Sequence, residues 1–183
     1  MNKWWYCLGM ALFCFCGCER ENGTGGIPAV TPFDLKRYMG TWYEIARNPH
    51  RFEKGLSHVS AVYTLNSDGT VSVLNRGIRE NGTESVIRGI AKACPPSGSG
   101  ELKVSFFRPF YGAYRVIWLS PDYRLAIVTS STKDYLWVLC RDRRISAEER
   151  EFVLHWLREH GFSVSQLEWI EQDRGKLQSK SEG

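Results

Sequence analysis

Few side chains in this sequence have the types and spacing that catalysis needs. Two of the four histidines, His155 and His160, lie five residues apart, so they do not share one face of a helix as metal ligands would. The chain carries neither a His-Glu-x-x-His zinc motif nor a Gly-x-Ser-x-Gly nucleophile motif. We therefore predict no catalytic residue, no metal site and no cofactor. Residues far apart in sequence can still meet in a fold, so an enzyme acting on a lipid-like substrate stays open as the alternative.

Residues suited to binding are more abundant. Aromatic residues make up 13% of the chain and lie mostly in runs that read as strands, which suits either a heavy core or an aromatic-lined pocket. The formal net charge is +4, and Lys and Arg are scattered among Asp and Glu. The densest basic stretch, 141–144, is interrupted by Asp142. Nucleic-acid binding requires a basic stripe, which this sequence lacks, so we expect no nucleic-acid partner.

The N-terminal segment has the pattern of a secretory signal. Lys3 is the only charged residue before Glu19, and 4–16 is almost wholly apolar but too short to span a bilayer as a stable anchor. Phe15-Cys16-Gly17-Cys18 resembles the lipobox of bacterial lipoproteins, in which small residues precede the cysteine that receives the lipid. Gly17 is small enough for this position. We therefore predict lipidation of Cys18, with an ordinary signal peptide as the alternative.

The lipobox also divides the chain. We predict a signal at 1–17, a lipidated N-terminus and flexible tether at 18–32, a folded domain at 33–172 and a polar tail at 173–183. Glu19 is not the aspartate that typically signals inner-membrane retention, so we expect a lipid-anchored protein of the bacterial envelope, at the outer rather than the inner membrane. Only Cys94 and Cys140 remain in the folded part. Two buried free thiols are expected there, and a disulfide stays open because an oxidising compartment would permit it.

The elements that must position any binding site are short strands. Asp68-Gly69 and Asn81-Gly82 are hairpin signals because these residues tolerate positive φ, and nearly every other connection is short. This regular spacing predicts an all-β fold, an eight-stranded antiparallel up-and-down β-barrel. The expected strands are 41–47, 58–65, 71–79, 84–94, 102–107, 114–119, 125–130 and 134–141.

One amphipathic helix is expected after the last of these strands. Ser146 and Glu149 form a capping box, since each side chain can satisfy an amide of the first turn, and Gly161 supplies the stop. Docking on the outside of the barrel would bury the apolar face. A membrane-surface helix is disfavoured, because the polar face is not strongly basic. That apolar face comprises Phe152, Val153, Trp156 and Leu157.

Three motifs in this order resemble the signatures of the lipocalin family. They are Gly40-Thr41-Trp42-Tyr43-Glu44-Ile45-Ala46-Arg47, then Asp134-Tyr135, then Arg141. With the lipobox, the chain is most similar to the bacterial outer-membrane lipocalins and to the apolipoprotein D branch, over about 31–172. The resemblance implies that Trp42 plugs the narrow end of the barrel and that Arg141 stacks on it. Gly40, Trp42 and Arg141 are therefore expected to be structural before they are functional.

The inward face of each strand is expected to line a ligand cavity. Alternation from Trp42 places Glu44 and Ala46 inward. Trp137 matches the pocket tryptophan of the apolipoprotein D branch. A one-residue bulge would invert any such assignment. The predicted ligand-binding residues are Tyr63, Asn75, Phe106, Tyr114, Trp118, Tyr135, Trp137 and Leu139, and Arg47, Arg79 and Arg115 are candidates to meet a carboxylate or phosphate near the mouth.

The resemblance implies a binding protein. We expect fatty acids or lysophospholipids as ligands, a membrane contact through lipidated Cys18, and a role in membrane maintenance under stress; a homodimer is compatible with the sequence. A barrel of eight strands is just wide enough for packed side chains or one small ligand. A purely structural envelope protein with a filled core therefore stays open as a third interpretation.

Overall fold

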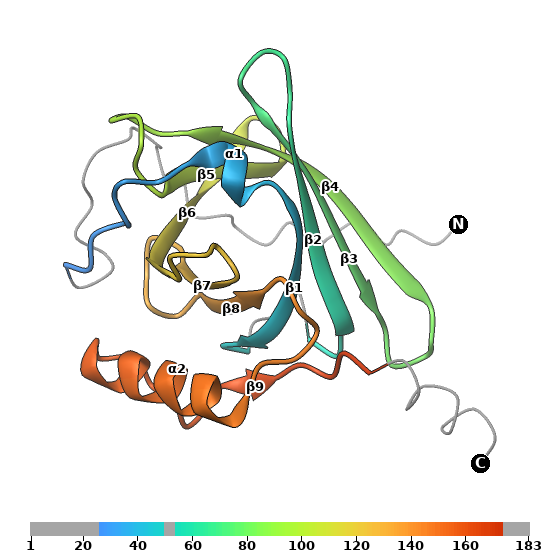
Figure 1. The fold of residues 1–183 in the computed structure, drawn as a ribbon. Helices are drawn as coiled ribbons and strands as arrows, with labels where there is room; N and C mark the ends of the chain where they lie inside the picture. The colour runs from blue at the N-terminus through green and yellow to red at the C-terminus, as the bar shows by residue number, and fades with distance from the viewer. Residues whose placement is uncertain (1–25, 50–53, 174–183) are drawn as a thin grey trace, which may run out of the picture.

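The computed structural model describes residues 26–49 and 54–173. The predicted signal, Cys18 and the tail from 174 onward lie outside these described residues. The elements are α1 (Leu35–Tyr38), β1 (Gly40–Arg47), β2 (Ser57–Leu65), β3 (Val71–Ile78), β4 (Glu84–Ala93), β5 (Glu101–Phe107), β6 (Phe110–Leu119), β7 (Leu125–Thr129), β8 (Leu136–Cys140), α2 (Ala147–Glu159) and β9 (Glu168–Trp169) (Figure 1).

Eight of the strands close into an antiparallel barrel. Neighbouring strands pair in chain order from β2 to β8, and β1 pairs with both β8 and β2, which completes the circle. The two-residue β9 adds to β1, and α2 lies outside the barrel (Figure 1). The predicted fold class is confirmed. No helix of the described ranges combines the length and the apolar character that a membrane crossing demands.

The hairpins follow from local sequence. Gly69 and Gly82 have φ of +79° and +80° in the β2–β3 and β3–β4 turns, as the Asp-Gly and Asn-Gly pairs predict. The β5–β6 hairpin is tighter than expected. Phe107 pairs with Phe110 across a two-residue turn, so 110–112 belongs to β6 rather than to a connection. In the up-and-down topology, this hairpin lies at the end of the barrel opposite α1, which we call the open end.

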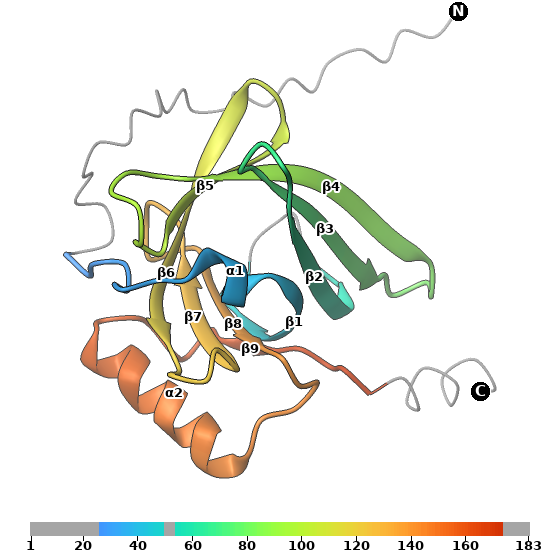
Figure 2. The ribbon, with the colours of Figure 1, turned by 45° about the horizontal axis from the view of Figure 1, so that its top comes forward.

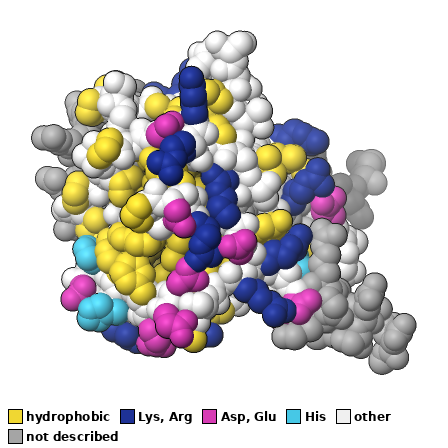
Figure 3. All heavy atoms as spheres, viewed as in Figure 1, with side chains coloured by type: hydrophobic (Ala, Val, Ile, Leu, Met, Phe, Trp, Pro, Cys, Tyr) yellow, Lys and Arg dark blue, Asp and Glu magenta, His cyan; other side chains and the backbone are white. Residues whose placement is uncertain are grey.

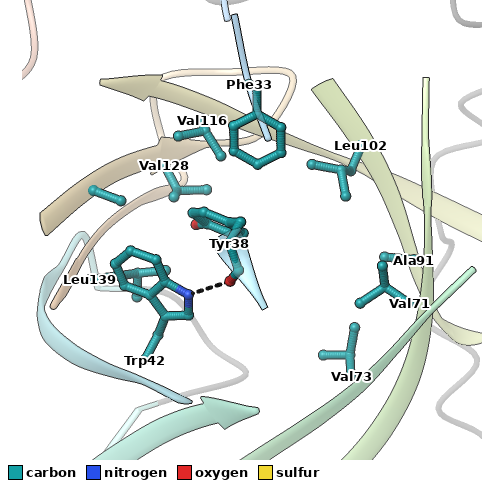
Figure 4. Close-up of a cluster of buried hydrophobic side chains, with 11 residues drawn as sticks. Phe33, Tyr38, Trp42, Val71, Val73, Ala91, Leu102, Val116, Val128 and Leu139 are labelled. Carbon is teal, nitrogen blue, oxygen red and sulfur yellow. Dashed lines mark hydrogen bonds between the residues drawn. The ribbon is translucent and has the colours of Figure 1, made fainter. Parts of the chain in front are cut away.

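The apolar side chains form two buried clusters. One fills the α1 end of the barrel interior (Figure 4). The other lies between the barrel wall and α2, where Val153 and Leu157 are fully buried. The capping box of Ser146 and Glu149 is present at the start of α2. The predicted docking of this helix on the outside of the barrel is confirmed.

Two β-bulges reverse part of the predicted alternation. In β6, Val116 pairs with Val128 and Trp118 with Ile127, so one extra residue interrupts the register. Trp118 consequently faces α2, with its ring 4.9 Å from that of Phe152, and the prediction that it contacts ligand is wrong. A second bulge in β1, between Glu44 and Ala46, turns Ala46 into the outer cluster, so its inward assignment is also wrong.

Basic and acidic side chains alternate on the face of the molecule that carries α1 and α2 (Figure 3). Both cysteines of the described residues, Cys94 and Cys140, are buried free thiols, as expected. Burial raises the pKa of the Cys140 thiol, which keeps it protonated and unreactive near neutral pH.

Candidate ligand-binding site

The α1 end of the barrel is closed by stacked aromatic and guanidinium groups. Trp42 is fully buried, and its Nε1 donates to the Tyr38 carbonyl oxygen at 2.9 Å (Figure 4). The guanidinium of Arg141 lies 3.9 Å from the centroid of the Trp42 ring. Arg141 also donates to the carbonyl oxygens of Thr41 and Arg37, at 2.8 and 2.9 Å. These contacts tie the last barrel strand to the first and to α1.

Gly40 makes this closure possible. Its φ of +97° is one that side-chain-bearing residues rarely adopt. A Cβ at this position would lie 3.3 Å from Nη1 of Arg141. The glycine therefore provides both the backbone turn into β1 and the space for the guanidinium.

Above this floor, the barrel holds a mostly apolar cavity of about 130 Å³. Pockets that enclose a drug-sized ligand have volumes of roughly 300–1,000 Å³, so this cavity encloses only part of such a molecule. Tyr38 of α1 and the adjoining Met39 are among its lining residues. Six of the predicted ligand residues line it: Tyr63, Asn75, Phe106, Tyr114, Trp137 and Leu139.

Tyr135 does not join them. It precedes β8, is 37% exposed and stacks on Trp137 with ring centroids 6.2 Å apart. The period-two alternation used to turn it inward applies only within a strand. Tyr135 is therefore not part of this cavity lining, and its contact with a ligand stays a prediction.

Three phenol groups form the polar centre of the lining. The Tyr114 hydroxyl lies 2.7 Å from that of Tyr38 and 3.1 Å from that of Tyr63. Burial raises the pKa of Tyr38 and Tyr114 well above the ordinary tyrosine value, so both stay neutral. Tyr38 projects from α1 into the barrel (Figure 4). Strand alternation could not reveal it, because it comes from a helical turn.

Asn75 supplies a second polar group. Its Oδ1 is buried and has no hydrogen-bond partner in the structure, while the residue lines the cavity. Buried acceptors in native proteins almost always have a partner. This oxygen is placed to accept a hydrogen bond from a hydroxyl, an ammonium group or a water in the cavity.

Two of the three candidate arginines have guanidinium groups that are paired with carboxylates of the protein. Arg47 is fully buried and donates to Glu44 Oε1 at 2.9 Å and to Glu168 Oε2 at 3.0 Å, so it joins β1 to β9. Arg115 forms an ion pair with Glu101 of the neighbouring strand β5. The expectation that Arg47 and Arg115 meet a ligand headgroup is therefore corrected, because carboxylates of the protein already pair with both guanidinium groups. Arg79 does lie at the open end, where Nη2 donates to Ser85 Oγ at 3.0 Å.

The lining contains the phenols, Asn75, Ser60 and Glu44 as its polar side chains. Glu44 is paired with Arg47. Within 26–49 and 54–173, no three or more His, Cys, Asp or Glu residues gather in a way that could hold a metal ion. The arrangement suits reversible binding of an apolar molecule that carries a few hydrogen-bonding groups.

Known proteins resemble this chain in sequence and in fold. Residues 33–172 match the model of the Lipocalin-like domain. Outer membrane lipoprotein Blc of Escherichia coli (strain K12) is 43% identical over 163 residues, covering 88% of this chain and 92% of the relative. Temperature-induced lipocalin-1 of Arabidopsis thaliana is 38% identical over 147 residues, covering 75% of this chain and 78% of the relative. Apolipoprotein D of Rattus norvegicus is 33% identical over 148 residues, covering 76% and 77%.

Among solved structures, insecticyanin from the tobacco hornworm Manduca sexta has the same fold, with a TM-score of 0.69 at 20% identity over 83% of this chain and 87% of that one. The name outer membrane lipoprotein, shared by relatives from Escherichia coli and Vibrio cholerae, supports a lipid-anchored location at the bacterial outer membrane. By its domain match and by these relatives, the chain belongs to the lipocalin family.

Proposed function

We propose that this protein binds a single-chain lipid, a fatty acid or a lysophospholipid, in the barrel cavity and carries it within the bacterial envelope. The lipid on Cys18 holds the protein at the outer membrane, and the binding activity serves membrane maintenance under stress. The single observation that carries the binding proposal is the cavity itself. It is apolar over most of its lining, yet Asn75 Oδ1 is buried there without a partner.

The dimensions favour a ligand that is only partly enclosed. The cavity of about 130 Å³ is smaller than the roughly 300–1,000 Å³ of pockets that enclose a whole drug-sized ligand. An acyl chain of ordinary membrane-lipid length fills this space and continues toward the open end, where its headgroup meets water. We propose that Tyr63, Asn75, Phe106, Tyr114, Trp137 and Leu139 contact the ligand.

We propose binding rather than catalysis. The phenols of Tyr38 and Tyr114 have raised pKa values, so they release protons poorly near neutral pH. Glu44 is held in an ion pair with Arg47. Recovering a bound lipid chemically unchanged after prolonged incubation supports this proposal. Conversion of the lipid by the protein, abolished in the Glu44→Gln or Tyr114→Phe variant, would replace it with a lipocalin-fold enzyme.

The binding proposal is tested by extracting the protein purified from bacterial envelopes with organic solvent and identifying the released lipid by mass spectrometry. We expect fatty acid or lysophospholipid at close to one molecule per cavity. The delipidated protein should then show a saturable change in tryptophan fluorescence with lysophospholipid, because Trp137 lines the cavity. A protein that neither releases nor takes up lipid would favour the filled-core interpretation instead.

A further inference from the structure

The exposed apolar residues are gathered at one end of the barrel. Of the described residues, six large hydrophobic side chains are exposed, and Phe152 on α2 is one of them. The other five lie at or near the open end: Val86 and Ile87 in the first half of β4, Tyr135 before β8, and Phe107 and Phe110 at the β5–β6 turn. Five exposed apolar residues at one end of the barrel indicate that this end forms an interaction surface.

The β5–β6 turn is the most exposed part of this end. Phe107 and Phe110 are 75% and 61% exposed, and they pair directly across the hairpin, so their rings lie on the same side of it. The hairpin projects from the barrel wall (Figure 2). We call residues 107–110 the aromatic tip.

Apart from Glu101 at the start of β5, which pairs with Arg115, the charged residues of this hairpin are all basic. From 102 to 121 the chain has no acidic residue. Its basic residues are Lys103, whose Nζ lies 5.6 Å from the centroid of the Tyr111 ring, exposed Arg108 within the tip, and Arg115, which pairs with Glu101. On the face that carries α1 and α2, by contrast, the two signs alternate (Figure 3). Exposed aromatic rings beside uncompensated basic groups are the composition of segments that rest in the headgroup region of anionic bilayers.

The size of the tip argues against a protein partner. A phenylalanine side chain offers roughly 200 Å², so exposed fractions of 75% and 61% leave on the order of 270 Å² of ring surface. A stable protein–protein interface buries about 800 Å² on each side. A narrow tip is sufficient to enter a lipid interface, which closes around whatever enters it.

We propose that the aromatic tip inserts into the headgroup region of an anionic lipid bilayer and sets the open end of the barrel against the membrane. In this orientation, a lipid leaving the bilayer passes directly into the cavity mouth. This second consequence rests on the proposed lipid-binding function, whereas the contact of the tip with the bilayer does not.

The contact is tested on the full-length, lipid-anchored protein in vesicles of seven parts phosphatidylethanolamine to three parts phosphatidylglycerol. An environment-sensitive fluorophore is attached in the F107C variant, where the native Cys94 and Cys140 are buried and do not react. The matched control is S67C, an exposed position in the β2–β3 turn at the α1 end. We expect a blue shift and quenching by headgroup-proximal nitroxide lipids for F107C, at least about twofold stronger than for S67C.

Each other outcome counts against the inference. Equal quenching at both positions means that the anchor alone brings the whole protein near the bilayer. No quenching at either position means that the tip stays in water. A shift for F107C that grows with protein concentration in the absence of vesicles would assign the tip to a second copy of the chain.

The consequence for lipid transfer is measured separately. The F107S/F110S variant should extract a fluorescent lysophospholipid from vesicles about tenfold more slowly, since two rings no longer hold the mouth at the bilayer. Its affinity for the same lipid presented below the critical micelle concentration should not change. Replacing phosphatidylglycerol with neutral lipid should slow extraction by the native protein and leave an R108E variant little affected. Normal extraction by F107S/F110S would overturn the role of the tip in transfer, whereas the absence of lipid binding by the native protein itself would contradict the proposed function instead.

Discussion

The guanidinium of Arg141 lies 3.9 Å over the ring of Trp42 and donates to the Thr41 and Arg37 carbonyl oxygens. A cation over an indole contributes about 0.5–2 kcal/mol, and a hydrogen bond from a charged donor about 1.5–3 kcal/mol. The two free-energy contributions come from the same guanidinium group, so they are not additive. Arg141 thus closes the barrel both by stacking and by satisfying two carbonyl groups.

The first prediction is that Arg141→Ala lowers the free energy of unfolding by about 2–4 kcal/mol, measured by urea denaturation. Arg141→Lys keeps the charge but not the planar fork, so it should recover less than half of this loss. The matched control is Arg143→Ala. Arg143 lies over the Tyr43 ring at 4.6 Å but is exposed, and its removal should cost less than about 1 kcal/mol. Equal losses for the two alanine variants would contradict the closing role.

The second prediction separates the two demands on Gly40. Gly69→Ala tests positive φ alone, since φ is +79° and a Cβ there meets nothing within 4 Å; it should cost about 1–2 kcal/mol. Gly40→Ala should cost more, because its Cβ also crowds Arg141 Nη1 at 3.3 Å. The measurement is again urea denaturation. In an Arg141→Ala background, the excess cost of Gly40→Ala should shrink, and an unchanged excess would show that the guanidinium is not what the Cβ meets.

Local sequence was sufficient for most of this fold. Asp-Gly and Asn-Gly set the turns before β3 and β4, and the capping box sets the start of α2, because each acts through atoms within a few residues. The strands therefore followed from turns and alternation. Bulges are different. The extra residue before Trp118 arises from pairing with β7, which local alternation does not contain, and one such residue turns every later side chain to the opposite face.

The cavity lining could be predicted from the sequence about as far as the fold could. Residues in regular stretches of strand, such as Asn75 and Phe106, line the cavity as alternation indicated. The contribution of Tyr38 to the lining could not be predicted in this way, because Tyr38 reaches the interior from a four-residue helix. The ion pair of Arg47 with Glu168 is also not predictable from the sequence, because Glu168 is 121 residues away and only the tertiary fold brings the two together.

The third prediction contrasts Trp118 and Trp137, which strand alternation predicts to line the same pocket. Trp137→Ala should weaken lysophospholipid binding about tenfold or more, because it removes apolar surface from the lining, and should leave the fold intact. Trp118→Ala should leave the affinity within about twofold, since this residue packs under α2, but should cost about 3–5 kcal/mol of stability. Titration by ligand-induced fluorescence and urea denaturation measure the two effects. Reversed phenotypes would mean that the lining is misassigned.

The fourth prediction concerns high pH. Burial raises the pKa of Tyr114 above its ordinary value, which is about 10, so the unfolded chain releases this proton at a lower pH than the folded protein does. Stability from this group is complete below pH 10 and falls as pH rises toward the folded pKa. Tyr114→Phe should be less stable than the native protein near pH 7, because hydrogen bonds to Tyr38 and Tyr63 are lost. The difference should narrow above pH 10 in urea denaturation; a constant difference would contradict the ionisation argument.

The fifth prediction concerns the buried ion pair of Arg47 and Glu44. Arg47→Met leaves a buried carboxylate without its cation, so the free energy of unfolding should fall by about 3–5 kcal/mol. Glu44→Gln in the same chain removes the stranded charge, and the double variant should recover much of the loss. The exposed pair of Arg76 and Glu84, with side chains 48% and 49% exposed, is the matched control; Arg76→Met should cost at most about 1 kcal/mol. Arg47 also donates to the Leu56 carbonyl oxygen at 3.2 Å. A double variant no more stable than Arg47→Met would mean that Arg47 acts through this oxygen and Glu168 rather than through Glu44.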